Sequence, residues 1–504
     1  MKEGVKNTGK LFGIFAWLIM LSGIVVRIAV YLQNRNFFID EANVARNVYE
    51  RGFAGLAKPL SYEQYAPPVF MWLLKLSGVL FGYGEYALRL YPIIAGVASV
   101  IALFYVLKEL MPDRALWYPL LLFCVGFIFI KYSSELKQYV SDALVTLLLI
   151  LLALKTDIFQ KRQTQFILLW CIAGSIAIWL SMPSVFTLAG IGLYYICICL
   201  QQKDYKRLLP VIITGGVWIA QFAFYYIVIL KPQANTDYLQ NFHREYFLIL
   251  VPKGYEEVRH NWGVIKELIN EASGYGKVNI ITNGLLIITG LVFFLKRNFS
   301  KSLLIIVPLG ATMLAAGLHQ YSLIPRVAIF MMPLLLILIG YGLEQVMRIR
   351  FVMPKALVAG AALYCAYIFS SLNMLYKPHL FEQVTDEFSF LQQHGIKGNE
   401  LYVHWGTKPA YIYYTQINPR KQQWQDLDNA HLVEWYTNWD STVQSIHGRA
   451  AFIYTSLSLE DAHNYNTQVK KYMALTDSLE IEDGRRYAYI YKPLSEATKS
   501  NSLK

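Results

Sequence analysis

Long apolar runs recur along most of this chain of 504 residues, and they restrict the folds that it can adopt. An α-helix needs about 20 apolar residues to cross a bilayer core of about 30 Å. Hydrophobic residues make up 55% of the chain and charged residues only 16%, which is typical of membrane proteins. We therefore predict a multi-span α-helical membrane protein with about 11 transmembrane helices. The predicted spans are residues 11–32, 91–110, 117–131, 136–154, 166–181, 184–200, 209–230, 278–295, 302–318, 323–345 and 354–372, of which the third and fifth are the least secure.

The loops between these runs alternate in length and charge. Every second loop is short and basic, so we expect these loops and the N-terminus to face the cytoplasm. Much of the net charge of +12 lies in these loops, and we therefore expect no nucleic acid as a partner. The opposite, exofacial side then carries a loop at 33–90, a loop at 231–277 and the tail at 373–504. The basic residues concerned are Lys2, Lys6, Lys10, Lys108, Arg114, Lys155, Lys161, Arg162, Lys203, Lys206, Arg207, Lys296, Arg297, Lys301, Arg348, Arg350 and Lys355.

The first apolar run and the cysteines bear on processing and redox chemistry. The run at 11–32 is too long for a secretory signal, and no Ala-x-Ala-like cleavage site follows it, so we expect a retained anchor. All five cysteines lie inside apolar runs. We therefore predict neither disulfides nor a thiolate metal site.

The exofacial segments have secondary structure of their own in this interpretation. Residues 41–52 suit a short amphipathic helix, and 67–81 suit an interfacial helix that begins at Pro67-Pro68 and is too short to span. The tail changes composition and mixes short β-like runs with helical segments. It predicts a small exofacial α/β domain at 373–504, separate from the membrane domain at 1–372. The expected strands are 400–404, 450–455 and 487–491, and the expected helices are 379–394 and 461–474.

Charged and aromatic residues gather in four segments on the predicted exofacial side. A carboxylate near the end of a span costs desolvation energy unless it faces a watered cavity or a partner, which makes such residues functional candidates. Topology alone places the four segments at one membrane face. They are Asp40-Glu41 with Arg46; residues 62–68 followed by Glu85 and Arg89; Lys131 to Tyr139, which includes Glu135 and Lys137; and His319 to Tyr321 followed by Arg326.

Most of these candidates also have a purely structural interpretation. Glu85 and Arg89 stand four positions apart, which favours an ion pair on a helix surface. The side chain of Lys137 could simply extend to lipid headgroups, and His319 could be an ordinary interfacial histidine. Arg326 at a membrane boundary would suit a phosphate or a distant carboxylate equally well.

The order of these motifs resembles that of the polyprenyl-phosphate-sugar-dependent glycosyltransferases of the GT-C superfamily, in the branch of the protein O-mannosyltransferases and the aminoarabinose lipid A transferases. The resemblance covers roughly residues 10–140 well. This branch often has an arginine two residues after the glutamate, where the present chain has Lys137, a point charge instead of a planar fork. The motifs are Asp40-Glu41 after the first span; Ala66-Pro67-Pro68 leading to Phe81-Gly82-x-Gly-Glu85-x-Ala-Leu-Arg89; Tyr132-Ser133-Ser134-Glu135-x-Lys137-x-Tyr139; and Gln320-Tyr321-x-x-x-Pro325-Arg326.

The resemblance implies an inverting transfer of a hexosyl or pentosyl group from a polyprenyl phosphate to a hydroxyl of an exofacial glycolipid, glycan or protein. Asp40 is then the expected general base. Glu41 would position Asp40, the acceptor or a metal ion. Glu135 would orient the sugar or the cations. The leaving phosphate needs cationic partners. The expected substrate-binding residues are Lys58, Arg89, Lys137, Tyr139, His319, Tyr321 and Arg326. The expected location is a bacterial inner membrane, with the tail in the periplasm or outside the cell.

Three further questions stay open at this level. No cofactor is required, although Asp40 and Glu135, with Glu41 and His319, could hold a divalent metal ion. A transporter or flippase for a lipid-linked or anionic substrate is the main alternative. It fits less well because the charges gather at one face and no inverted repeat is evident. A ligand sensor that uses the tail would leave the one-sided acidic and basic clusters unexplained.

The topology can be tested by labelling. Cysteines introduced at positions 40 and 400 should react with a membrane-impermeant maleimide from the same side of the membrane. Cysteines in the short basic loops should react only from the other side. Labelling of positions 40 and 400 from opposite sides would contradict both the topology and the proposed chemistry.

Overall fold

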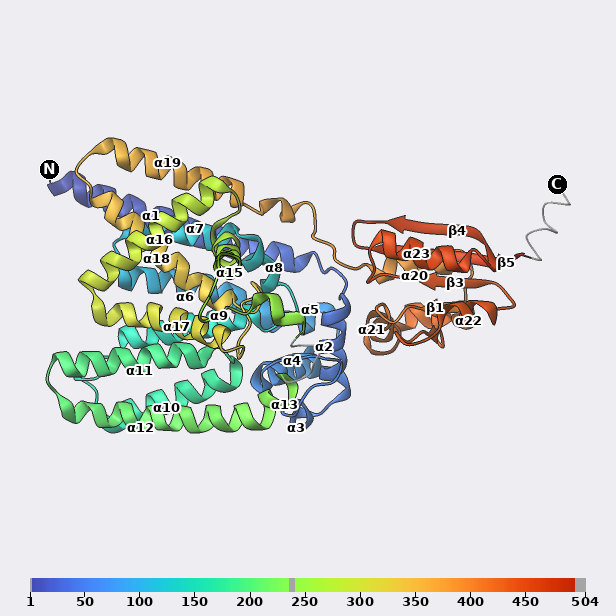
Figure 1. Ribbon diagram of the computed structural model, residues 1–504, viewed down its shortest axis with the longest axis horizontal. Helices are drawn as coiled ribbons and strands as arrows, with labels where there is room; N and C mark the ends of the chain where they lie inside the picture. Colours follow the sequence, from blue (N-terminus) through green and yellow to red (C-terminus); the bar gives the residue numbers. More distant parts are fainter. Residues whose placement is uncertain (1, 235–240, 495–504) are drawn as a thin grey trace.

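Apolar helices run side by side through the larger part of the molecule, and a small mixed sheet follows them at one end (Figure 1). This computed structural model describes residues 2–234 and 241–494. Parts of two predicted exofacial segments, 235–240 and 495–504, lie outside the described residues.

Within the described ranges, nine helices are long and apolar enough to cross a membrane, and they coincide with nine of the predicted runs. The nine include the first run, 11–32, and the fifth run, 166–181, which was one of the two least secure predictions. The corresponding helices are α1 (Lys2–Leu32), α6 (Leu90–Leu110), α10 (Gln163–Leu180), α11 (Ser184–Gln201), α12 (Leu208–Tyr225) with its π-helical extension η3 (Tyr226–Leu230), α16 (Lys277–Arg297), α17 (Phe299–Gly317), α18 (Met332–Arg348) and α19 (Val352–Phe369).

The remaining two predicted runs form shorter helices. Residues 117–131 are divided at Gly126 into α7 (Trp117–Val125) and α8 (Phe127–Ser133), and 136–154 correspond to α9 (Tyr139–Lys155). At Gly126 the backbone forms an isolated β-bridge with Ser370, and an added Cβ would lie 2.8 Å from the Phe369 ring. The bridge requires extended backbone at Gly126, which interrupts the helix. The close ring leaves no room for a side chain at this position. The count of eleven spans therefore stays a prediction.

The tenth predicted run, 323–345, begins too early. A 3-10 turn at η5 (Ile329–Met331) precedes α18, and residues 322–328 are irregular. Pro325 and the hydrogen bond from Tyr321 Oη to the Val327 carbonyl accompany this irregular segment. As a result, Arg326 lies outside the regular helix, before the bundle begins.

The two ends of the bundle differ in the way that the charge pattern predicts. At one end, short basic loops contact one another: Arg114 pairs with Glu344, and the Arg207 guanidinium donates to the Lys161 carbonyl. The other end carries the expected helices α2 (Ile39–Glu50) and α4 (Pro68–Phe81), with α3 (Phe53–Leu56) and α5 (Glu85–Leu88), and the sheet lies beyond them (Figure 1). The placement of α4 along the membrane interface remains a prediction.

The segment between α12 and α16 contains elements that the sequence analysis did not identify. Besides the short helix α13 (Lys231–Ala234) and a 3-10 turn at η4 (Arg244–Tyr246), it forms α15 (Tyr255–Ser273). Helix α15 is amphipathic, and its buried positions include Val264, Leu268 and Ala272. Its many charged residues hid this apolar face from a search for continuous apolar runs.

The C-terminal sheet has the strand order β2-β1-β3-β5-β4. Strand β1 pairs in parallel with β2 and β3, whereas β5 pairs antiparallel with β3 and β4. The strands are β1 (Leu401–Val403), β2 (His431–Leu432), β3 (Ala450–Ile453), β4 (Met473–Ile481) and β5 (Arg486–Pro493), and the helices are α20 (Val384–Gln393), α21 (Lys408–Ile412), α22 (Trp439–Gln444) and α23 (Leu459–Val469). The three predicted strands are present, and β2 and β4 were missed.

Both helix boundaries predicted in the tail were wrong at one end. Helix α20 begins at Val384 and not at 379, because the preceding residues contact the first exofacial loop, for example Phe381 against the Phe38 ring. Helix α23 ends at Val469, and Met473 already begins the edge strand β4. Strand β4 has several exposed polar residues, so its sequence resembles the polar end of a helix.

The C-terminal sheet and the first exofacial loop share one hydrophobic core. Phe37 and Leu136 from the membrane part pack in the same buried cluster as Phe388 and Ile490 from the tail. Three hydrogen bonds cross this boundary. Phe37 N donates to Tyr414 Oη and Ile39 N donates to Glu382 Oε2, both at 2.9 Å. Asn418 Nδ2 donates to Glu85 Oε2 at 3.1 Å. The tail is therefore fixed against the segment that contains Asp40.

Helices α16 and α18 approach so closely that two glycines are required between them. An added Cβ at Gly290 would lie 2.0 Å from the Leu338 carbonyl oxygen, and one at Gly342 would lie 2.1 Å from that of Leu286. Gly290→Ala should therefore destabilise the fold by about 1–3 kcal/mol through overpacking. Gly284→Ala on the same helix meets no atom within 4 Å and should cost nothing. Thermal unfolding in detergent would compare the two, and equal melting temperatures would contradict this packing.

Candidate active site

Asp40 and Glu41 lie in the first turn of α2, close behind the end of α1. Consecutive residues on a helix point in directions about 100° apart, so the two carboxylates have different surroundings. The side chain of Asp40 is 33% exposed, whereas that of Glu41 is fully buried. One carboxylate is therefore accessible to a substrate, and the other is part of the interior.

Glu41 forms a bidentate ion pair with Arg89. Arg89 Nε donates to Glu41 Oε1 at 2.8 Å and Nη2 to Oε2 at 2.6 Å, and the backbone N–H of Leu136 also donates to Oε1 at 2.7 Å. Burial opposes the charge on Glu41, but Arg89 and Arg35 outweigh it and lower the pKa of this carboxyl. The geometry thus fits Glu41 as a positioning residue, which connects α2 to the start of α6 and to the turn at 134–138.

Asp40 lies beside Lys137 and Gln64. Lys137 Nζ is 3.6 Å from Asp40 Oδ2 and donates to Gln64 Oε1 at 2.8 Å, while Gln64 Nε2 approaches Asp40 Oδ1 at 3.5 Å. The charge of Lys137 lowers the pKa of Asp40, Arg326 adds to this effect, and partial burial opposes it. Asp40 is therefore ionised at neutral pH and able to accept a proton.

Glu135 lies in the turn between α8 and α9, and it is buried. Its Oε2 has no hydrogen-bond partner among the described residues. Burial raises the pKa of Glu135, and the charges of Lys131 and Arg35 only partly offset this effect. Arg35 also donates to the Ser134 carbonyl at 3.1 Å, so it holds this turn against the end of α1.

Arg326 comes from the irregular segment before α18. Its guanidinium is within electrostatic reach of Asp40, Glu135, Tyr132 and Tyr139, and it lies 5.4 Å from the centre of the Phe242 ring. Its Nε is buried and has no hydrogen-bond partner in the described part of the chain. No carboxylate lies within ion-pair distance of this guanidinium among the described residues.

The structure corrects the expected pairing of Glu85 with Arg89. Arg89 is turned inward to Glu41, while Glu85 pairs with Arg420 of the tail at 3.2 Å. The two residues therefore contact different neighbours, because Glu85 begins α5 at the boundary with the tail. As the Arg89 side chain is only 3% exposed and fully engaged, it is not presented to a substrate.

The remaining candidates divide into two groups. Tyr139 packs at a right angle on Tyr132 near Lys137, and Tyr321 packs on Phe186 and Phe330 while its hydroxyl donates to the Val327 carbonyl. His319 is exposed and stacks on Phe247, and Lys58 is exposed on the loop after α3, so neither is fixed in the cluster around Asp40. Arg35 and Glu382 were not among the candidates from the sequence, and Gln64 was included only as a member of the segment 62–68. None of the three carries a spacing signal of its own.

The fit of a metal ion can be judged from the donors present. Among the described residues, no group of three His, Cys, Asp or Glu side chains is placed to hold a metal ion. Asp40 is occupied by Lys137 and Gln64, and Glu41 by Arg89. The four-residue set of Asp40, Glu41, Glu135 and His319 is therefore not assembled as a metal site.

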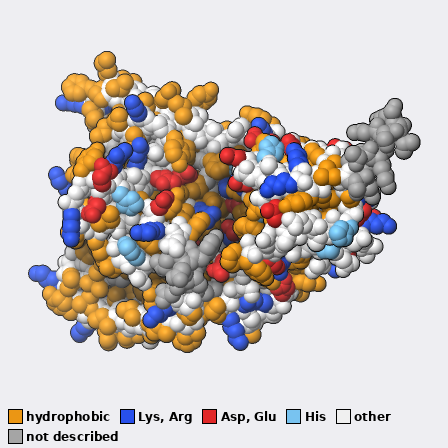
Figure 2. All heavy atoms as spheres, turned by 45° about the vertical axis from the view of Figure 1, so that its right-hand side comes forward, with side chains coloured by type: hydrophobic (Ala, Val, Ile, Leu, Met, Phe, Trp, Pro, Cys, Tyr) orange, Lys and Arg blue, Asp and Glu red, His pale blue; other side chains and the backbone are white. Residues whose placement is uncertain are grey.

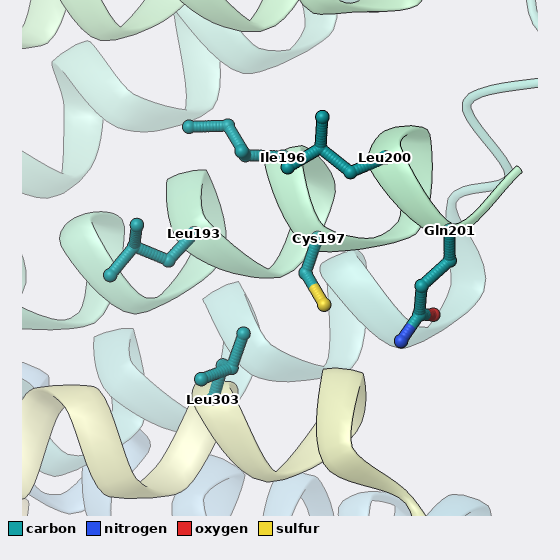
Figure 3. A pocket seen from close by; sticks show the side chains of 6 residues that line it. All are labelled: Leu193, Ile196, Cys197, Leu200, Gln201 and Leu303. Atoms are coloured by element: carbon teal, nitrogen blue, oxygen red, sulfur yellow. The ribbon is translucent and has the colours of Figure 1, made fainter. Parts of the chain in front are cut away.

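The surroundings of this cluster also differ from those of the cavity between α11 and α17. That cavity, of about 420 Å³, is lined by Leu193, Ile196, Cys197, Leu200, Gln201 and Leu303 (Figure 3). It is apolar and lies at the end of the bundle with the short basic loops. By contrast, acidic and basic side chains surround the hollow between the bundle and the sheet domain (Figure 2).

The buried pair of Glu41 and Arg89 should dominate the stability of this region. Glu41→Gln removes the counter-charge of a buried arginine and should destabilise the protein by about 3–5 kcal/mol. Glu50→Gln on the same helix removes a half-exposed partner of Arg46 and should cost at most about 1 kcal/mol. Melting temperatures of the two variants in detergent test this difference, and similar shifts would show that the buried pair has no special weight.

Comparisons with known proteins agree with this architecture. The family model described as dolichyl-phosphate-mannose-protein mannosyltransferase matches residues 65–226. The crystal structure of apo ArnT from Cupriavidus metallidurans is similar over 97% of this chain and 98% of its own, with a TM-score of 0.51 and 14% identity. ArnT bound to undecaprenyl phosphate gives a TM-score of 0.52 at 14% identity, over 94% of this chain and 97% of its own.

A relative in sequence is an uncharacterized protein of Aquifex aeolicus, which is 24% identical over 230 residues. The match spans 44% of this chain and 44% of that relative, less than half of either. The chain thus has the multi-span membrane fold of ArnT with a small C-terminal sheet domain, and the fold that the resemblance implied is confirmed.

Proposed function

We propose that this protein transfers a sugar from a polyprenyl phosphate to a hydroxyl group of an exofacial acceptor, with inversion at the anomeric carbon. The observation that carries this proposal is the convergence of Asp40, Lys137 and Arg326 from three distant segments at one end of the bundle. The reaction needs a base and a stabiliser of a phosphate leaving group around one carbon, and these groups supply both. The membrane fold suits a donor whose polyprenyl tail lies among lipids.

In the proposed step, the acceptor oxygen forms a bond to the anomeric carbon while the bond from that carbon to the phosphate oxygen breaks. The hydroxyl proton passes to a carboxylate of Asp40. Asp40 suits this role because it is ionised and one-third exposed, whereas Glu41 and Glu135 are buried. Its lowered pKa makes it a weak base, so proton transfer is expected late, when the attacking oxygen has become acidic.

The bonding electrons of the broken bond go to the lipid phosphate, which gains negative charge. Arg326 and Lys137 supply positive charge at this point, and the free donor capacity of Arg326 fits a phosphate oxygen. Glu135 would keep these cations oriented or bind the sugar. Tyr139 and Tyr321 would line the sugar site, and Lys58 and His319 could join it only by moving. A divalent metal ion is not needed for this scheme.

The acceptor, a glycolipid, glycan or protein, and the transferred hexosyl or pentosyl group are not specified by these residues. The location that fits is a bacterial inner membrane, with the N-terminus in the cytoplasm and the sheet domain outside. The predicted division into a membrane domain at 1–372 and a soluble domain at 373–504 belongs to this proposal.

The role of Asp40 is tested by Asp40→Asn. The amide keeps the volume of the side chain but cannot accept the proton at neutral pH, so turnover should fall by about a hundred- to ten-thousand-fold. Binding of the lipid donor and the melting temperature should persist. Transfer assays in nanodiscs with Glu50→Gln as the control measure this effect, and near-normal turnover would mean that Asp40 is not the base.

The role of Arg326 predicts a different kinetic signature. The phosphate is anionic before transfer and gains charge during it, so Arg326→Ala should raise KM for the lipid donor and also lower kcat. The matched control is Arg244→Ala, an exposed arginine on the neighbouring exofacial segment. Steady-state kinetics and donor-binding assays compare the two variants. A change in neither parameter would exclude Arg326 as the phosphate partner.

A further inference from the structure

A second concave site lies in the C-terminal domain, at the carboxyl ends of its parallel strands. Its lining includes residues after β1, residues after β2 and one face of α23. They are His404 and Trp405; Val433, Glu434, Trp435, Thr437 and Trp439; and Asn464, Tyr465 and Gln468. In the strand order, β2 lies on one side of β1, and β3, β5 and β4 lie on the other. From β1 the chain goes on to β2, and from β3 it goes on through α23 to β4, so the direction of the connections reverses between β1 and β3. In sheets with parallel strands, such a point of reversal is the usual place for a ligand. The cavity measures about 270 Å³, close to the lower limit of about 300 Å³ for drug-sized ligands, so a single ring fits it.

Two exposed tryptophans lie at this cavity. Trp405 is 42% exposed and Trp435 is 76% exposed. Exposed tryptophans cost free energy in water, and their negative ring faces attract the partially positive C–H groups on one side of a sugar ring.

Two buried hydrogen-bond donors also lie at the cavity without a partner. Gly406 N donates to His404 Nδ1 at 3.2 Å, which leaves the ring proton on His404 Nε2. Neither this Nε2 nor Trp439 Nε1 has a hydrogen-bond partner within the described part of the chain, and both side chains are more than nine-tenths buried. Buried donors of this kind are normally satisfied, but neither nitrogen has accessible surface, so they lie behind the lining and are not counted as ligand contacts.

The other polar groups are of mixed donor and acceptor character. Asn464 and Gln468 stand one turn apart on the same face of α23, and each amide can both donate and accept. Glu434 at the rim is paired with Lys408, and burial lowers the pKa of His404 to about 4, so the site carries no net positive charge. Sugar hydroxyls match this mixture, whereas a phosphate would need a free cation and a proline-rich peptide would offer acceptors alone.

From these observations we propose that the C-terminal domain binds a neutral saccharide unit in this cavity, with Trp405 and Trp435 against its ring and the amides of Asn464 and Gln468 hydrogen-bonded to its hydroxyls. The site is separate from Asp40 and goes beyond the proposed transfer reaction. A saccharide held there would tether a glycan chain to the domain that contacts the active-site loop.

The full-length protein in nanodiscs tests this proposal by calorimetry and saturation-transfer NMR. The probes are methyl glycosides of glucose, mannose, galactose and N-acetylglucosamine, and their disaccharides. We expect saturable binding of at least one probe, weakened about tenfold or more by Trp435→Ala. Tyr436→Ala is the matched control, because Tyr436 is an equally exposed neighbour outside the lining. On α23, Gln468→Ala should weaken binding and Thr467→Ala should not.

Binding should also persist in Asp40→Asn, so failure of the transferase proposal would not affect this result. Three outcomes would overturn the saccharide site: no binding of any probe, equal loss in Trp435→Ala and Tyr436→Ala, or preference for inorganic phosphate or a proline-rich peptide over every saccharide. Melting temperatures of the variants exclude unfolding as the cause of a loss.

Discussion

A buried ion pair, Glu41 with Arg89, determines how the end of the bundle next to the sheet domain is arranged. Two charges in the interior are tolerated only when further hydrogen bonds satisfy them. Here the Arg89 guanidinium also donates to the Arg35 carbonyl at 2.6 Å, and Leu136 N donates to Glu41. Four segments that are distant in sequence therefore meet at one point: the end of α1, the first turn of α2, the start of α6 and the turn before α9.

This arrangement explains how two adjacent carboxylates can have different tasks. A helical turn directs Glu41 inward and leaves Asp40 partly exposed, so the fixed residue determines where the exposed one lies. Because Lys137 belongs to the turn that Glu41 contacts, the same ion pair also determines the distance between Asp40 and its cation. The proposed base and one of the proposed phosphate partners are thus placed by one interior contact.

Much of the fold could be predicted because membrane helices are encoded locally, in runs of apolar residues. The orientation expected from the charges of the short loops stays a prediction. The breaks could not be predicted in this way: Gly126 interrupts a run because of contacts with Phe369 and Ser370, far away in sequence. The candidate site was predicted as a set of residues but not as a set of pairs. Spacing favoured Glu85 with Arg89, whereas the long-range partners Arg420 and Glu41 carry no local signal. The two-residue strand β2 and the polar edge strand β4 likewise depend on pairing with the rest of the sheet.

The C-terminal domain completes the framework that places Asp40. Helix α2 has Phe38 at its N-cap, which offers no side-chain acceptor, so the first N–H groups of the helix need partners from elsewhere. Glu382 of the tail accepts from Ile39 N, and burial raises the pKa of Glu382 to about 8, so its carboxyl is largely neutral at pH 7. A neutral group caps the helix without adding a second negative charge close to Asp40. Since the tail also accepts from Phe37 N through Tyr414, the residues immediately before Asp40 are fixed by the C-terminal domain and those after it by the helical bundle. A ligand that moved the tail would therefore move the first turn of α2, and with it the carboxylate of Asp40.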